Sequence, residues 1–398
     1  MRKLNNFSSK RVGVLVRKRR SSSILPNAFK GHFKRAMLAA LLLVSTSGSS
    51  NSSSRYGVVN DDTSPIDTNI PPAPPLMSKT NPNLRYFSMY GVEGLDPAMV
   101  KGWVNFLATT NHAQIARFHT AKAGSSLFSL QSTLFCGPLL CPDYKTKWRA
   151  LLNSTIEPGL ADGSLMGVHF GDELCWMCTP WTNLSAAVDL VRTDLPRGKA
   201  ILTYNEAYPV FTLGLPERDG GLWQWNCDTG GGTHPPRPAP GMANVSYPRV
   251  PEGLDWLSLD YYPSEGTVAG VARLFREQIY PKMSAAQKVM FVPPGYGADT
   301  PAHSNQLCCN NNTRDGPNPP CNGDCATAML VWAKGIYDWA RTDPRIAALN
   351  VFHYDSSATP GLYQPGVGKM PSVLAAWKLI GAEIVSGQLR DLDFSGLI

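Results

Sequence analysis

The stretch Gly167-Val168-His169-Phe170-Gly171-Asp172-Glu173-Leu174-Cys175-Trp176 predicts a short buried strand that ends on two adjacent carboxylates. Two charges inside a strand are unfavourable, because an ionised carboxylate that is buried without a partner loses its hydration. At the end of a strand that opens into a cleft, the same charges can be solvated, paired and used. The alternative interpretation is a surface turn rich in acidic residues. The rest of the chain favours the first interpretation.

Short apolar runs alternate with helix-like segments on both sides of this stretch. The expected strands are Leu84–Val92, Ala113–His119, Leu127–Phe135, Met166–Phe170, Ala200–Tyr204, Trp256–Tyr261, Val289–Val292 and Leu349–Tyr354. The expected helices, which carry apolar residues at three- and four-residue spacing, are Asp96–Thr109, Tyr144–Leu160, Asn183–Asp194, Thr267–Lys282, Ala326–Arg341 and Ser372–Ser386. Eight strands with intervening helices predict an α/β fold, a single-domain (β/α)8 TIM-type barrel with long disulfide-bearing loops. A doubly wound open sheet is the alternative to the barrel, and a helix is the alternative to the strand at Leu127–Phe135.

The chain divides into a leader, a stalk and this barrel. Residues 1–54 form a basic leader with a short apolar segment, residues 55–82 a Pro-rich stalk, and residues 83–398 the barrel domain of catalytic type. Residues 1–35 contain 11 Lys or Arg and no acid, so the remaining chain holds 26 basic against 30 acidic residues. The body is therefore mildly acidic, and the formal net charge of +7 gives no case for nucleic-acid binding.

The apolar run Ala36–Val44 follows the basic block. It is too short for a bilayer span, which needs about 20 residues, but it suits a secretory signal peptide. We therefore expect secretion or residence in the lumen of the secretory pathway. A Golgi-type anchor and organelle targeting are the alternatives, and membrane contact is expected only through an uncleaved leader. Glycosylation sequons at Asn51, Asn153, Asn183, Asn244 and Asn311 agree with the secretory route.

All nine cysteines lie at or after Cys136. Four of them, Cys308, Cys309, Cys321 and Cys325, fall in a region rich in Asn, Gly and Pro without apolar periodicity. Disulfides contribute most in such irregular segments, so we expect a disulfide-bonded glycoprotein. Zinc binding is the alternative, because Cys175-x-x-Cys178 resembles a ligand pair, but no second such pair follows at zinc-ribbon spacing.

Polar side chains recur at the predicted carboxyl ends of the strands, where the active site of a barrel lies. Tryptophan and tyrosine offer an apolar face with a polar edge, so a ring of such residues with acids is typical of a carbohydrate cleft. We expect substrate contacts from Tyr90, His119, Trp176, Tyr204, Glu206, Tyr261, Tyr296, Tyr354 and Asp355.

The segment His169-Phe170-Gly171-Asp172-Glu173 with Trp176 is similar to the His-x-Gly-Gly-Asp-Glu motif of β-N-acetylhexosaminidases, and the barrel order resembles the (β/α)8 glycoside hydrolases. The resemblance implies that Asp172 orients the 2-acetamido group of the substrate, which acts as nucleophile, and that Glu173 is the general acid/base. This chain has one Gly where the family has two.

Families with two catalytic glutamates carry the second at the end of the seventh strand. Here that strand is followed by Pro293-Pro294-Gly295-Tyr296, without an acid. A second carboxylate must then come from Glu206, Asp260 or Asp355, and we choose Asp260, which two tyrosines follow.

We therefore predict a glycoside hydrolase with Glu173, Asp172 and Asp260 as catalytic residues, a carbohydrate substrate, and neither metal nor cofactor. Proximity to Asp172 and partial burial should raise the pKa of Glu173, which suits an acid working near neutrality. Two other classes remain open. One is a secreted sugar-binding or cell-wall barrel without catalysis. The other is a metal-dependent hydrolase that uses His119, His169, Asp172, Glu173 and His353.

Overall fold

A computed structural model describes residues 80–175, 177–207, 247–261, 268–295, 325–354, 357–359, 362–364 and 366–397. The predicted leader and nearly all of the predicted stalk lie outside these residues. The same holds for three expected substrate contacts, Trp176, Tyr296 and Asp355, and for the cysteines from Cys308 to Cys321.

Eight parallel strands form one sheet in the order β1-β10-β9-β8-β7-β6-β3-β2. The strands are β1 (Tyr86–Met89), β2 (Phe106–Thr109), β3 (Ser125–Ser129), β6 (Leu165–His169), β7 (Ile201–Ala207), β8 (Trp256–Asp260), β9 (Lys288–Val292) and β10 (Ile346–Val351). This order follows the chain around a circle, so the sheet is the (β/α)8 barrel that the sequence predicts.

Asn105 joins the two ends of the sheet. Its backbone N–H donates to Phe87 O at 3.0 Å, and its side-chain oxygen accepts from Phe87 N at 2.9 Å. Its side-chain amide also donates to Arg85 O at 2.8 Å. The side chain thus takes the place of a peptide unit between β1 and β2, and it satisfies backbone groups that an open edge would leave exposed.

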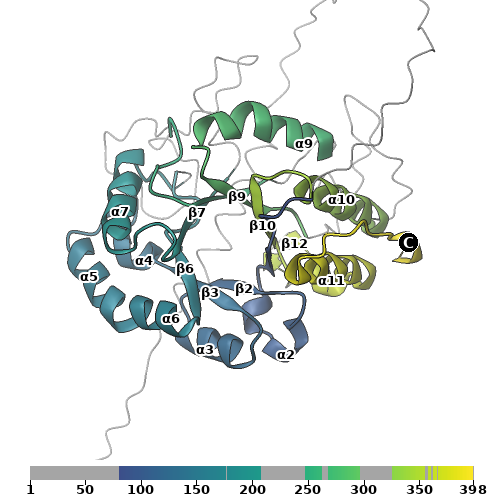
Figure 1. The fold of residues 1–398 in the computed structure, drawn as a ribbon, viewed down its shortest axis with the longest axis horizontal. Helices are drawn as coiled ribbons and strands as arrows, with labels where there is room; N and C mark the ends of the chain where they lie inside the picture. The colour runs from purple at the N-terminus through teal and green to yellow at the C-terminus, as the bar shows by residue number, and fades with distance from the viewer. Residues whose placement is uncertain are drawn as a thin grey trace, which may run out of the picture. The chain divides into compact units, whose positions relative to one another are not determined.

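Helices surround the strands (Figure 1). They are α2 (Pro97–Val100), α3 (His112–Thr120), α4 (Gln131–Leu134), α5 (Tyr144–Leu151), α6 (Glu157–Asp162), α7 (Trp181–Asp194), α9 (Val268–Leu274), α10 (Cys325–Ala340) and α11 (Pro371–Ser386). A π-helical turn, Leu152–Ile156, joins α5 to α6, and α9 continues as turns Phe275–Ile279 and Tyr280–Lys282. Short 3-10 turns are Val92–Gly94, Val367–Lys369 and Ser395–Leu397. Antiparallel pairs are β4 (Phe135–Cys136) with β5 (Leu139–Leu140), and β11 (Ser357–Thr359) with β12 (Leu362–Gln364).

The prediction of a strand over Ala113–His119 is wrong, because this segment is part of α3. Asn111 caps the helix by accepting from Ala113 N at 3.0 Å. The buried residues Ile115 and Phe118 are three apart, which is a helical spacing rather than the alternation of a strand.

The second barrel strand is instead β2, which lies inside the segment predicted as the helix Asp96–Thr109. In that segment α2 ends at Val100, and Gly102 adopts a φ of +92° that breaks the helix. The predicted strand Leu127–Phe135 is likewise shorter than expected, because β3 ends at Ser129 and α4 follows.

The barrel interior changes from apolar to polar along the strands. One end is filled by a cluster of Phe106, Leu127, Trp256, Met290, Ala347 and Ala348. On β8, Trp256, Ser258 and Asp260 share the inward face because side chains alternate along a strand, while Leu257 and Leu259 pack in the main core. The strands therefore carry acids and amides into the barrel at their carboxyl ends.

Three of the cysteines in the described parts of the chain, Cys136, Cys141 and Cys178, are disulfide-bonded. Cys136 and Cys141 are joined across the β4–β5 hairpin, and Cys178 is also disulfide-bonded. Cys175 is buried and is not its partner, so Cys175-x-x-Cys178 is not a disulfide pair. None of the helices in the described parts of the chain is long and apolar enough to cross a membrane.

Candidate active site

A turn after β6 carries Asp172 and Glu173 at the carboxyl ends of the strands. Two backbone hydrogen bonds fix it to β7: Asn205 N donates to Gly171 O at 3.0 Å, and Glu173 N donates to Asn205 O at 2.9 Å. The ladder between neighbouring strands thus continues past the last residue of β6. Both acids are partly exposed at the mouth of the barrel.

Gly171 is needed for the path of this turn. Its φ is +154°, and a Cβ built there would lie 2.9 Å from the Leu174 side chain and 3.0 Å from that of Gln131. Glycine tolerates this conformation and this crowding, so the chain can leave the strand sharply and aim Asp172 across the barrel.

Glu173 has a backbone φ of +49°, in the left-handed region that side chains with a Cβ disfavour. Such a conformation costs on the order of 1–3 kcal/mol and persists where surrounding contacts enforce it. Here Met177 N donates to Glu173 O at 2.8 Å, in addition to the bond from Glu173 N to β7. The strained backbone holds one defined direction for the Glu173 side chain.

Gln131 supports the turn from the side of β3. Its side-chain oxygen accepts from Asp172 N at 3.3 Å, and its amide nitrogen contacts Asp172 O at 3.5 Å and Met177 Sδ at 3.3 Å. Gln131 begins α4, close in sequence to the disulfide of Cys136 and Cys141. The orientation of Asp172 therefore depends on neighbours on both sides of β6.

Asn205 connects two of the predicted carboxylates. Its amide nitrogen donates to Asp172 Oδ1 at 2.7 Å and to Asp260 Oδ1 at 3.1 Å. Its oxygen accepts from the Ser258 hydroxyl at 2.6 Å, which fixes the orientation of the amide. The acids predicted at the fourth and sixth strands thus meet through a residue of the fifth.

The environments of Glu173 and Asp172 differ. The pKa of Glu173 is raised well above its usual value by burial and then by the negative charges of Asp260, Asp172 and Glu206. Burial also raises the pKa of Asp172, but the hydrogen bond from Asn205 opposes this shift because it stabilises the ionised form. Of the two, Glu173 therefore holds its proton more tightly, and Asp172 more readily carries charge.

Tyr90 lies where β1 ends, near the same carboxylates. Burial raises the pKa of its hydroxyl well above the usual value, and the charges of Asp172, Asp260 and Glu173 raise it further. The phenol therefore remains protonated, as a hydrogen-bond donor at the mouth of the barrel.

Two other expected substrate contacts, Tyr261 and Tyr354, are partly exposed and pack against the edge of the core. Tyr354 N donates to Tyr90 O at 2.7 Å, so the residues after β10 lie beside the end of β1. Their roles toward a substrate remain predictions.

The structure separates three expected residues from this group. Tyr204 and Glu206 are fully buried, and Tyr204 packs in the outer core beside Tyr247. They alternate along β7 with the inward-facing Asn205, so they point away from the barrel interior. His119 lies near the end of α3, close to Gly163, which precedes β6 at the opposite end of the barrel. The expected substrate contacts of these three residues are not supported by their positions.

Sequence reasoning missed Asn205 and Gln131 as site residues. Asn205 was detectable, because a strand whose partly buried Ile201 packs against the cluster inside the barrel places Thr203 and Asn205 on the same face. For Gln131 the sequence offered no comparable signal, since its role follows from how α4 turns back over β6.

The described residues contain no group of three or more His, Cys, Asp and Glu side chains arranged to hold a metal ion. His169 is buried, and burial lowers its pKa to about 4, so it is neutral at physiological pH. His353 is also buried, after β10.

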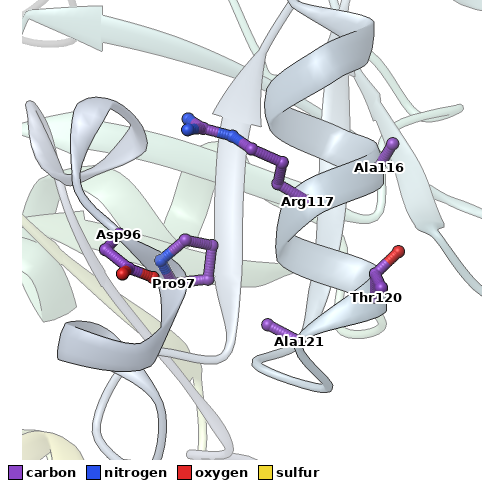
Figure 2. Close-up of a pocket in the computed structure, with 6 residues that line it drawn as sticks. All are labelled: Asp96, Pro97, Ala116, Arg117, Thr120 and Ala121. Atoms are coloured by element: carbon purple, nitrogen blue, oxygen red, sulfur yellow. The ribbon is translucent and has the colours of Figure 1, made fainter.

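A surface hollow lies on the outside of the barrel, between the start of α2 and the end of α3. Arg117 and Ala121 face Asp96 and Pro97 across it (Figure 2). It contains none of the carboxylates described above.

No model of a known protein family matches the chain, and no curated protein matches it in sequence. Solved structures with a similar fold include a GH18 chitinase from Pseudoalteromonas aurantia, at 12% identity and a TM-score of 0.34, covering 68% of this chain and 93% of that one. A thermostable mutant of a xylanase, Xyn10A from Cellvibrio japonicus, aligns at 12% identity and a TM-score of 0.39, covering 74% and 97%. Saccharomyces cerevisiae Gas2p, in complex with laminaritriose and laminaritetraose, aligns at 10% identity and a TM-score of 0.36, covering 72% and 58%.

Proposed function

We propose that this protein is a glycoside hydrolase with Glu173 as its general acid/base. The proposal is supported by one observation: Glu173 and Asp172, at the mouth of the barrel, lie in different environments that affect their pKa values differently. Glycosidic bond cleavage needs one carboxylic acid that stays protonated and one carboxylate that stays charged. The raised pKa of Glu173 and the hydrogen bond from Asn205 to Asp172 provide this division.

Asp172 and Asp260 are the candidate negative partners. Each accepts a hydrogen bond from Asn205, so each is stabilised in its ionised form while it faces the barrel mouth. A positive charge develops on the sugar in the transition state, and these two carboxylates would stabilise it. Tyr90, held neutral, would donate a hydrogen bond to a sugar hydroxyl or to a reacting oxygen.

The substrate class that we propose contains N-acetylhexosamine. This rests on the similarity of the His169–Glu173 segment to the β-N-acetylhexosaminidase motif. In that mechanism Asp172 would orient the 2-acetamido group, and Asn205 would hold Asp172 in place. Asp260 would then stabilise charge rather than form a covalent bond.

We further propose that the protein acts in an oxidising compartment such as the secretory lumen or the exterior. The disulfide between Cys136 and Cys141 and the disulfide of Cys178 support this, because such bonds persist in oxidising environments. The side chain of Asn153, in one of the predicted sequons, is exposed and accessible to glycosylation.

A panel of 4-methylumbelliferyl glycosides, including the N-acetylglucosaminide and N-acetylgalactosaminide, tests the proposal with protein from a secreting host. Glu173→Gln serves as the active-site variant, and Glu277→Gln removes an exposed carboxylate elsewhere as a matched control. Release of fluorophore by the wild type and the control, but not by Glu173→Gln, supports a glycosidase. If the same glycosides bind to wild type and to Glu173→Gln without turnover, the alternative of a sugar-binding barrel is favoured.

A further inference from the structure

Glu206 is a carboxylate that the proposed chemistry leaves without a role. It is fully buried on the outward face of β7, the face opposite to the one that carries Asn205. Burial of an ionised carboxylate is strongly unfavourable unless contacts compensate. Glu206 therefore needs compensating contacts at this position, one residue from the amide that binds Asp172 and Asp260.

Glu206 contacts the turn that carries Glu173. Its Oε2 accepts a hydrogen bond from Cys175 N at 2.7 Å, and Cys175 lies two residues after Glu173. Together with the two backbone bonds of Asn205, β7 therefore contacts the turn at Gly171, at Glu173 and at Cys175. The left-handed backbone of Glu173 lies between these contacts.

The charge of Glu206 also acts on its surroundings. It raises the pKa of Glu173, although burial and the charges of Asp260 and Asp172 have larger effects on that carboxyl. Burial first, and then the charge of Glu206, raise the pKa values of Cys175 on the same turn, of Tyr204 on β7 and of Tyr247 beside it. These three groups stay neutral, so Glu173 is the neighbour whose protonation matters for the proposed catalysis.

We propose that Glu206 is a positioning residue for the turn after β6 that carries Asp172 and Glu173, here called the acid turn. From the outward face of β7 it anchors this turn and places a negative charge near the Glu173 carboxyl. It touches no substrate. It holds the backbone that directs Glu173 and favours the protonated form of that group, as a like charge does for a neighbouring acid. The inference rests on the proposed function only in that Glu173 is taken as the general acid.

Two variants separate the effect of the hydrogen bond between Cys175 N and Glu206 from the effect of the negative charge of Glu206. Glu206→Gln keeps an oxygen that can accept from Cys175 N but removes the charge. Glu206→Asp keeps the charge but shortens the side chain, so the contact with Cys175 is lost. Glu277 is an exposed glutamate on the turn after α9, and Glu277→Gln controls for the removal of one negative charge.

The first measurement is a direct titration of Glu173 by NMR of carboxyl-13C-labelled glutamate, with the Glu173→Gln protein to assign the signal. In Glu206→Gln the pKa of Glu173 should fall, because a like charge has been removed. In Glu206→Asp, which keeps the charge, and in Glu277→Gln, which removes a distant one, the pKa of Glu173 should stay at the wild-type value. An unchanged pKa of Glu173 in folded Glu206→Gln would overturn the proposal, whether or not the protein hydrolyses glycosides.

The second measurement is the pH dependence of kcat on whichever glycoside is turned over. A general acid works in its protonated form, so Glu206→Gln should move the high-pH limb of the profile to lower pH, by the shift that the titration measures, while retaining most of the maximal kcat. Glu206→Asp should lower kcat about tenfold or more at every pH without moving the limb. Equal profiles for all variants would contradict the positioning role. A wild type without turnover would count against the proposed function alone, since the titration stands independently of it.

Discussion

The side-chain amide of Asn205 donates a hydrogen bond of 2.7 Å to Asp172 Oδ1. Its other amide hydrogen is directed to Asp260 Oδ1 at 3.1 Å. Because the two N–H bonds of an amide diverge by about 120°, the two acceptor oxygens lie roughly 5 Å apart. One neutral residue thus holds two acids at a fixed separation and reduces the repulsion between them.

Replacing Asn205 with Ala should therefore impair activity more than folding. The variant leaves Asp172 and Asp260 without their shared donor and Ser258 without its acceptor. We expect kcat to fall about 10²-fold or more, and the free energy of unfolding to fall by about 1–3 kcal/mol. Steady-state kinetics and urea unfolding measure the two effects.

Asn83→Ala is the control for this substitution, because Asn83 donates to Pro344 O at an exposed position. It should leave kcat unchanged. Asn205→Ala with kcat within threefold of wild type would show that the shared amide is not needed for the reaction.

Gly171→Ala should displace the acid turn. The added Cβ would lie 2.9 Å from Leu174 and 3.0 Å from Gln131, and the φ of +154° disfavours a side chain. Gly198→Ala is the matched control, since Gly198 also has a positive φ, +84°, but no atom lies within 4 Å of its added Cβ. Both variants should lose about 1 kcal/mol of stability from the backbone alone. Only Gly171→Ala should reduce kcat, and equal kinetics in the two would contradict the account.

Glu173→Gln should be more stable than wild type at neutral pH. The pKa of Glu173 is raised in the folded protein, so the folded state binds its proton more tightly than the unfolded state. The stability associated with this group is full below the unfolded value near 4.5 and is lost as the pH rises through the raised value. Urea unfolding should show a difference between variant and wild type that grows from pH 4 to pH 7. A difference independent of pH would indicate that Glu173 titrates normally.

Buried His169 should make the fold sensitive to acid. Burial lowers its pKa from 6.5 to about 4. The unfolded chain therefore binds a proton that the folded protein does not, and stability is lost as the pH falls from 6.5 toward 4. The loss attributable to this group approaches about 3 kcal/mol. His169→Gln should be less destabilised between pH 7 and pH 4.5 than His112→Gln, which replaces an exposed histidine. Parallel losses in the two variants would argue against a buried neutral His169.

The sequence predicted the barrel because most of its strands are apolar runs separated by well-patterned helices. It failed between Asp96 and His119, where β2 is only four residues long and α3 exposes most of its surface. There the capping by Asn111 and the closure of the sheet by Asn105 decide the structure, and hydrophobic periodicity reports neither.

For the site, the acids at the ends of the fourth and sixth strands were predictable from their position in the barrel. Their connection through Asn205 depends on side-chain geometry. The direction of Glu206 followed from its parity with Asn205 along β7, but the backbone group that it binds depends on how the turn after β6 folds back.

Glu173, as the proposed general acid, donates a proton to the leaving group, so the activity lost in Glu173→Ala should depend on how much protonation the leaving group needs. For the sugar identified with the fluorogenic panel, kcat/KM is measured on two substrates. One is a dinitrophenyl glycoside, whose leaving group departs without protonation. The other is the corresponding disaccharide, whose leaving sugar needs a proton. We predict a loss of about 10³-fold or more on the disaccharide and less than about tenfold on the dinitrophenyl glycoside. Equal losses on both substrates would contradict the assignment of Glu173 as the general acid.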